Sequence, residues 1–223
     1  ANRLIARGTP FPLIQPAGID GRTGLGGFSV SQSGVLAYFA ESASNTQLKW
    51  FDANGMEAGA VGQVGSPVKP QLSPDGETVM IDPVDPSLNR RSIWLLRGGR
   101  GADTRVTFGE TDSFQPIWSP DGHKVAFGAS GSESAGSSLI IKSADGAGSS
   151  ETIVSAKTSI LPSDWSARAG LLVYSQVRDM GSSTDLWTVP LSGSRKPVLY
   201  RERSGYGHLS PDARWMLYGS ADT

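Results

Sequence analysis

Short runs of hydrophobic residues, each of strand length, alternate with polar turns along the whole chain, and one turn phrase recurs. Ser-Pro-Asp-Gly occupies residues 73–76 and 119–122, and Ser-Pro-Asp-Ala occupies residues 210–213. Weaker copies, in which the serine and the flanking hydrophobic residues remain, begin at Ser31 and Ser166. Proline fixes φ, aspartate hydrogen-bonds to nearby backbone and glycine accepts a left-handed conformation, so the phrase predicts a tight turn between two strands.

The turn serines recur at a nearly constant interval. Positions 31, 73, 119, 166 and 210 are separated by 42, 46, 47 and 44 residues. In each complete unit one apolar run precedes the turn, a second follows it, and two more come later, as at residues 138–141 and 150–154. No segment keeps the 3.6-residue period of a packed helix. Four strands in about 45 residues is typical of a propeller blade, so the pattern predicts an all-β fold, a β-propeller of four-stranded blades forming one domain over residues 1–223.

Five blades are expected, at residues 27–65, 68–108, 114–154, 161–200 and 206–223. The last blade contains only two strands. Residues 1–17 hold two apolar runs around a turn at residues 8–10, and we expect them to supply the missing two strands. Such two-plus-two closure between the N- and C-termini would remove an exposed sheet edge. The alternative is a truncated six-blade propeller that stays open or is completed by another chain.

Four of the six tryptophans occupy repeated positions. Trp118 and Trp165 directly precede their turn serines, and Trp94 and Trp187 lie at matching places in the third strands. Aromatic side chains dominate the surface buried between packed sheets. We therefore expect these four indoles to pack between adjacent blades.

Residues 115–127, with the sequence Gln-Pro-Ile-Trp-Ser-Pro-Asp-Gly-His-Lys-Val-Ala-Phe, resemble the TolB-type propeller repeat, a relative of the Trp-Asp repeats. Residues 48–55, 185–193 and 195–198 are similar to propellers that lie C-terminal to bacterial serine/threonine kinases. The resemblance covers roughly residues 27–223. It implies a propeller, usually of six blades, that acts as a sensor or interaction module in an extracytoplasmic or periplasmic location. The repeat itself is scaffolding, so the resemblance implies a fold more strongly than a ligand.

The charge balance argues against polyanionic partners. Twenty Lys and Arg residues face 21 Asp and Glu residues, a net charge of -1, so no global field would attract nucleic acid or acidic lipid. No run of about 20 apolar residues is present, and the N-terminal sequence has no signal-peptide pattern, so we expect no membrane insertion.

Composition and motifs also narrow the chemistry. The absence of cysteine excludes disulfides, thiolate metal sites and cysteine nucleophiles, and two histidines cannot build a multi-histidine metal site. Neither the kinase signature motifs nor a Gly-x-Ser-x-Gly nucleophile elbow occurs. We therefore expect no metal, no cofactor and no enzymatic activity.

Polar residues lie four and two positions before the turn serines, in the strand of each blade that should line the axial channel. The candidate binding residues there are Lys69, Gln71, Gln115, Asp164, Tyr206 and His208. An imidazole at His208 opposite Asp164 could hold a water, an ion or a small polar ligand. The alternative is that the channel is filled with water and simply needs polar walls.

A second set of candidates lies in the loops after the second and fourth strands, which should emerge on one face. These loop-face candidates are Asp82, Asp85, Asp112, Arg178 and Asp179. Two carboxylates at the axial mouth could serve a glycosidase-like hydrolase, with their separation setting the stereochemistry. In the Asp82-Pro83 and Asp85-Pro86 pairs, however, the aspartates are also common turn formers.

The pattern as a whole favours a non-catalytic binding scaffold. A propeller presents independent loops on one rigid frame, which suits a protein, a peptide or a small polar ligand at the loop face or in the channel. Self-association is expected if the ring is incomplete. The hydrolase with loop carboxylates is the alternative.

Overall fold

The computed structural model describes residues 28–30, 36–38, 46–52, 54–65, 69–85, 87–98, 102–109, 111–131, 136–178 and 183–220. All regular elements in these ranges are β-strands, as the repeat pattern predicts. No helix long and apolar enough to cross a bilayer occurs in them.

The first two sheets are four-stranded and antiparallel. Sheet 1 consists of β1 (Phe28–Val30), β2 (Leu36–Tyr38), β3 (Thr46–Phe51) and β4 (Glu57–Gly65), in that order. Sheet 2 consists of β5 (Gln71–Leu72), β6 (Val79–Ile81), β9 (Trp94–Leu96) and β10 (Thr104–Arg105). A separate hairpin of β7 (Val84–Asp85) and β8 (Arg90–Arg91) is inserted between β6 and β9.

The next sheets repeat this order. Sheet 3 consists of β11 (Asp112–Trp118), β12 (Lys124–Ser130), β13 (Ser137–Ser143) and β14 (Glu151–Ala156). Sheet 4 consists of β15 (Ile160–Ser166), β16 (Leu171–Val177), β17 (Thr184–Pro190) and β18 (Val198–Arg201). The last sheet has two strands, β19 (Ser204–Leu209) and β20 (Met216–Ser220).

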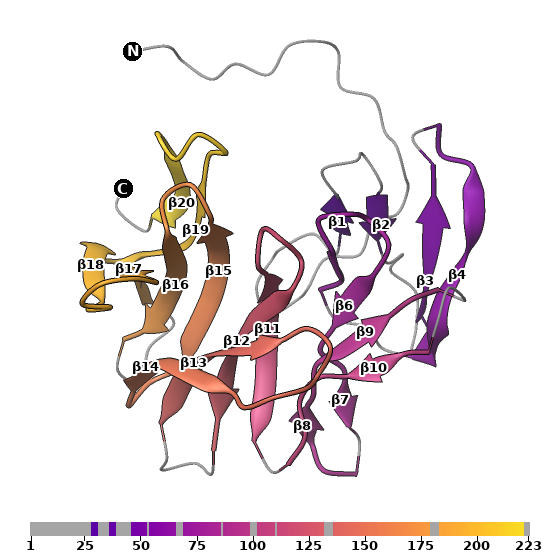
Figure 1. Cartoon of the computed structure of the whole chain (residues 1–223), viewed down its shortest axis with the longest axis horizontal. Helices are drawn as coiled ribbons and strands as arrows, with labels where there is room; N and C mark the ends of the chain where they lie inside the picture. Colours follow the sequence, from indigo (N-terminus) through magenta and orange to yellow (C-terminus); the bar gives the residue numbers. More distant parts are fainter. Residues whose placement is uncertain are drawn as a thin grey trace.

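The sheets follow one another around a common axis (Figure 1). Their first strands are neighbours in space: β1 contacts β5, β5 contacts β11, β11 contacts β15, and β15 contacts β19. Radial sheets joined through their first strands are the arrangement of a β-propeller, which confirms the predicted fold class. The predicted closing strands within residues 1–17 lie outside the described residues, so the five-blade ring and its closure stay predictions.

Hydrophobic side chains fill the spaces between consecutive sheets. One cluster, including Leu48 and Val79, lies between sheets 1 and 2; a second, including Met80 and Phe127, lies between sheets 2 and 3. The third, with Leu139 and Leu172, lies between sheets 3 and 4. All four expected tryptophans are partly buried against these clusters: Trp94, Trp118, Trp165 and Trp187. Their predicted role between blades is confirmed.

The repeated turn is held by the side chains that define it. The Ser119 hydroxyl accepts a hydrogen bond from the Lys124 N–H at 2.8 Å and donates to Asp121 Oδ1 at 2.6 Å. The Gly122 N–H donates to the Ser119 carbonyl at 2.9 Å, with glycine at φ 73°. Donation by the serine hydroxyl lowers the pKa of Asp121 below 3.8. The turns at Ser73 and Ser210 repeat the hydroxyl bonds.

Replacing Ser119 with Ala is expected to cost about 0.5–1.5 kcal/mol of unfolding free energy, because the part-buried hydrogen bond from the Lys124 N–H to the serine hydroxyl is lost. Urea unfolding measures this cost. The degenerate copy offers a matched control, since Ser166 Oγ accepts one exposed hydrogen bond, from the Ala169 N–H at 3.1 Å. Ser166→Ala should therefore cost clearly less, and equal losses in the two variants would contradict the assigned role of the phrase.

Candidate functional site

Five of the six axial candidates surround one cavity of about 90 Å³ between the first strands of the sheets. Sheets 2, 3 and 4 and the last sheet each contribute to its wall. The lining residues are Lys69, Gln71, Gln115, Pro116, Ile117, Pro162, Ser163, Tyr206 and His208. The two-residue period of strands therefore predicts which positions face the axis, with the exception of Asp164.

Three of these residues have a strained backbone. Lys69, Gln115 and Tyr206 have φ values of 51°, 48° and 55°, in the left-handed region that side-chain-bearing residues rarely adopt. Each stands four residues before its turn serine, so the strain repeats from sheet to sheet. Each costs on the order of 1–2 kcal/mol, and such strain persists only where neighbouring groups enforce it.

At two of the three residues, a side chain of the preceding sheet holds the backbone in place. The Gln115 N–H donates to Asp82 Oδ2, and the Tyr206 N–H donates to Ser175 Oγ, both at 2.9 Å. Asp82 and Ser175 each stand nine residues after their own turn serines. Pro162 fills the same place in sheet 4 and has no N–H to offer.

The residue of sheet 3 that faces Pro162 has no side chain. Gly128 stands nine residues after Ser119, where sheets 2 and 4 carry Asp82 and Ser175. A Cβ on Gly128 would lie 2.5 Å from the Ile160 carbonyl oxygen. Pro162 has no N–H that needs a hydrogen-bond partner, and sheets 3 and 4 lie too close together here to leave room for a side chain at position 128.

Three polar side chains at the cavity make no hydrogen bond within the described part of the chain: those of Gln71, Gln115 and His208. Ser163 differs, because its hydroxyl donates to the Gly207 carbonyl at 2.8 Å and joins sheet 4 to the last sheet. Two amides and an imidazole thus remain available to a bound molecule. A cavity of this size holds a few water molecules or one small polar group.

Asp164 does not line the cavity. Its Oδ1 accepts the Trp165 N–H at 2.9 Å, and its Oδ2 accepts the Leu209 N–H at 2.7 Å. The carboxylate therefore joins sheet 4 to β19. The expected pairing of Asp164 with His208 across the channel is wrong, because the backbone N–H groups of Trp165, in the same strand, and of Leu209, in the next sheet, take the two oxygens.

Asp82 was expected on the loop face, and this placement is also wrong. It lies between sheets 2 and 3 with 2% of its surface exposed, since its Oδ2 binds the Gln115 N–H. Its Oδ1 is buried and has no hydrogen-bond partner among the described residues. Burial raises the pKa of Asp82 from 3.8 to about 6, although the Gln115 N–H and the charges of Arg91 and Lys69 act to lower it.

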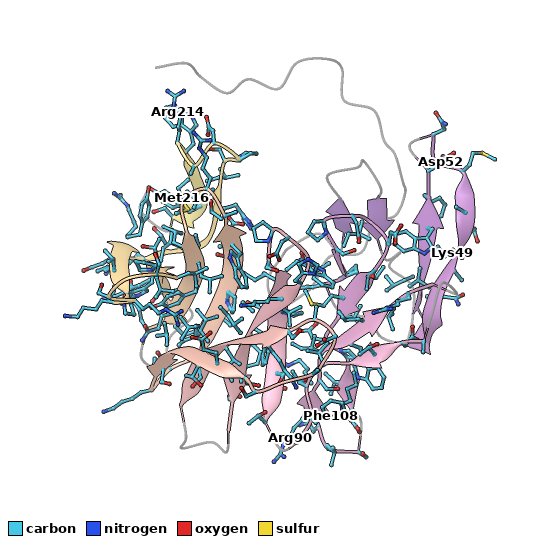
Figure 2. All side chains as sticks on the ribbon, viewed as in Figure 1. Lys49, Asp52, Arg90, Phe108, Arg214 and Met216 are labelled. Atoms are coloured by element: carbon cyan, nitrogen blue, oxygen red, sulfur yellow. The ribbon has the colours of Figure 1, made fainter. Side chains whose placement is uncertain are left out.

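Asp112, another loop-face candidate, lies beside β8. Figure 2 shows Arg90 of β8 and Phe108 at the end opposite Arg214, which lies at the tip of the β19–β20 turn. Near β8, the Arg91 guanidinium binds both carboxylate oxygens of Asp112.

The remaining loop-face candidates hold local structure. Asp85 Oδ1 accepts the N–H and the hydroxyl of Ser87. Arg178 binds Asp185 at 2.9 Å and Glu202 at 3.6 Å. Asp179 lies outside the described residues. No group of three or more His, Asp or Glu residues suited to a metal ion occurs in the described ranges.

Radial four-stranded sheets around an axial cavity define the chain as a β-propeller. No family model and no curated protein matches the sequence. TolB from Acinetobacter baumannii is similar in structure, with a TM-score of 0.64 and 17% identity over 81% of this chain and 44% of that one. A putative TolB from Agrobacterium tumefaciens has a TM-score of 0.66 and 18% identity over 88% of this chain and 70% of that one.

An enzyme shares the same fold. Oligogalacturonate lyase from Vibrio parahaemolyticus has a TM-score of 0.62 and 10% identity over 91% of this chain and 64% of that one. This chain therefore spans less than half of the Acinetobacter protein and about two thirds of the other two. At these identities the likeness shows the fold, that of a TolB-type β-propeller. The similarity to kinase-associated propellers stays a prediction.

Proposed function

We propose that the chain is a non-catalytic binding module whose ligand site is the axial cavity. The observation that carries this proposal is the convergence on one cavity of three polar side chains, those of Gln71, Gln115 and His208, that make no hydrogen bond to any described residue. The cavity wall also has a repeatedly strained backbone, and such strain concentrates at functional sites.

The state of the loop carboxylates favours binding over hydrolysis. A glycosidase-like site needs one carboxyl group whose pKa is raised so that it can act as a general acid. Donation by the Ser87 hydroxyl instead lowers the pKa of Asp85. Burial acts to raise the pKa of Asp112, but the hydrogen bonds and charge of Arg91 outweigh it and lower that pKa. Asp82 has a raised pKa but is buried away from substrate.

Resemblance supports the wider setting of the module. We propose that it acts outside the cytoplasm, in a periplasmic or similar compartment, and binds a protein, a peptide or a small polar ligand. The support is the likeness of residues 115–127 to the TolB-type repeat and the TolB-like fold.

Nuclear magnetic resonance of the ¹⁵N-labelled chain tests the site. Three small probes of different charge are titrated: sodium acetate, acetamide and methylammonium chloride. At least one should shift the amide resonances of Gln71, Gln115 and His208 in a saturable way.

Two variants test whether the probes bind in the axial cavity. His208→Trp puts an indole at an exposed wall position and should abolish the shifts, whereas Arg214→Trp, at the turn tip of the same sheet, should leave them unchanged. The proposal is overturned if no probe shifts the lining residues, or if the shifts persist in His208→Trp.

A further inference from the structure

We propose that the axial cavity is a carboxylate site, which takes either a small organic acid or the C-terminal carboxylate of a peptide. This inference rests on the proposed function, since it assumes that the axial cavity is the ligand site. It adds the chemical class of the ligand.

The wall of the cavity is one-sided in charge. Lys69 carries the one permanent charge among the nine described lining residues, and none of the nine is an Asp or Glu. Lysine ammonium groups bind carboxylates through charge-assisted hydrogen bonds, which are stronger than those between neutral groups. A cationic ligand would be repelled by Lys69, and none of the nine described lining residues has a carboxylate that could offset this repulsion.

Three uncharged polar side chains of the wall can act as donors. The side-chain amides of Gln71 and Gln115 each have two N–H donors, and a neutral imidazole at His208 has one. These three side chains make no hydrogen bond within the described part of the chain. A carboxylate accepts about four hydrogen bonds, so it can use several of these donors at once.

The two acidic residues beside the cavity direct their oxygens elsewhere. Both carboxylate oxygens of Asp164 accept backbone N–H groups, and Asp82 Oδ2 accepts the Gln115 N–H behind the wall. Asp82 still interacts with Lys69 through its charge. Asp82→Asn should therefore strengthen carboxylate binding, because it removes a negative charge that competes for the same lysine.

The size of the cavity restricts the ligand. A volume of about 90 Å³ is well below the roughly 300–1,000 Å³ of pockets that enclose a drug-sized ligand. Acetate, with four non-hydrogen atoms, fits in that space, whereas a longer ligand can place only its carboxylate end there. Free acids and peptide C-termini share this end group, and the experiment distinguishes them.

The test is a titration at pH 7.5 with acetate, acetamide and methylammonium, followed by Gly-Gly-Ala with a free and with an amidated C-terminus. Acetate should bind at least about tenfold more tightly than the isosteric acetamide or the methylammonium cation. Its hydrogen bonds to the Lys69 ammonium group are charge-assisted and stronger than those of a neutral amide, and the ammonium group repels a cation. Tighter binding of the free tripeptide than of acetate identifies a peptide C-terminus as the source; the reverse order identifies a small acid.

Variants of Lys69 test the role of its positive charge. Lys69→Gln should weaken acetate about tenfold or more, Lys69→Arg should retain binding, and Lys124→Gln, at an exposed position outside the cavity, should have no effect. Near-ultraviolet circular dichroism confirms that each variant is folded. Equal binding of acetamide, or unchanged acetate binding in folded Lys69→Gln, overturns the carboxylate site and leaves the binding module intact. Binding of no probe overturns both.

Discussion

Replacing Asp82 with Asn is expected to raise the unfolding free energy at pH 8 by up to about 3 kcal/mol, while changing it little at pH 4. The pKa of Asp82 is about 6 in the folded protein because the carboxyl group is buried, against 3.8 for an exposed aspartate. The folded state therefore binds the proton more tightly than the unfolded chain between these two pH values. Stability from this group is complete below pH 4 and falls as the pH rises through 6.

Asn resembles the protonated acid and keeps an oxygen that can accept the Gln115 N–H. It removes the cost of burying the charge and leaves the bond between sheets 2 and 3 in place. Urea unfolding of both proteins at intervals from pH 4 to pH 8 gives the difference directly. A difference that does not change with pH would show that Asp82 titrates normally, and would contradict the assigned burial.

Asp85→Asn is the matched control, because its effect should have the opposite sign. The Ser87 hydroxyl lowers the pKa of Asp85, so the ionised form stabilises the folded chain. That contribution is present above the unfolded pKa and is lost as the pH falls through the folded pKa. At neutral pH Asp85→Asn should therefore lose a little stability, whereas Asp82→Asn gains it.

Local patterns predict much of this fold. The turn phrase is recognisable because its stabilising bonds lie within five residues, from Ser119 to Lys124. The strand period then identifies the cavity wall, including Gln71 and Gln115. The packing of four tryptophans between sheets is also predicted by their repeated positions in the units.

Bonds between sheets are not visible in such patterns. Asp82 and Asp164 look like free acidic residues in the sequence, yet both bind backbone N–H groups more than 30 residues away. Ser175 does the same for Tyr206 and was not among the candidates. One signal is present in the repeats of the central sheets: the position nine residues after the turn serine is Asp82 or Ser175 where the next sheet offers an N–H, and Gly128 where it offers Pro162. Reading it requires knowing that the sheets are adjacent.

Closure of the ring is the other feature that local patterns leave open. The position seven residues after the turn serine packs against the following sheet. Met80, Ala126 and Val173 occupy it in sheets 2, 3 and 4, and each has 0% of its surface exposed. Leu217 occupies it in the last sheet and is 77% exposed. The described residues therefore leave the outer face of β19–β20 uncovered.

Alanine substitution at two of these positions measures that difference in solution. Met80→Ala should cost about 2–5 kcal/mol, the usual range for removing a buried methionine or leucine side chain. Leu217→Ala removes a similar side chain from an exposed surface and should change the unfolding free energy by less than about 0.5 kcal/mol. Urea unfolding of both variants at one pH provides the comparison.

Similar losses in the two variants would contradict the exposed face, because Leu217 would then be packed in solution. Dependence of the Leu217→Ala effect on protein concentration separates two ways of packing it. A loss that grows with protein concentration requires a second copy on the face of β19–β20, since association stabilises by mass action. A loss that is independent of concentration requires cover from within the same chain, as the predicted two-plus-two closure would provide.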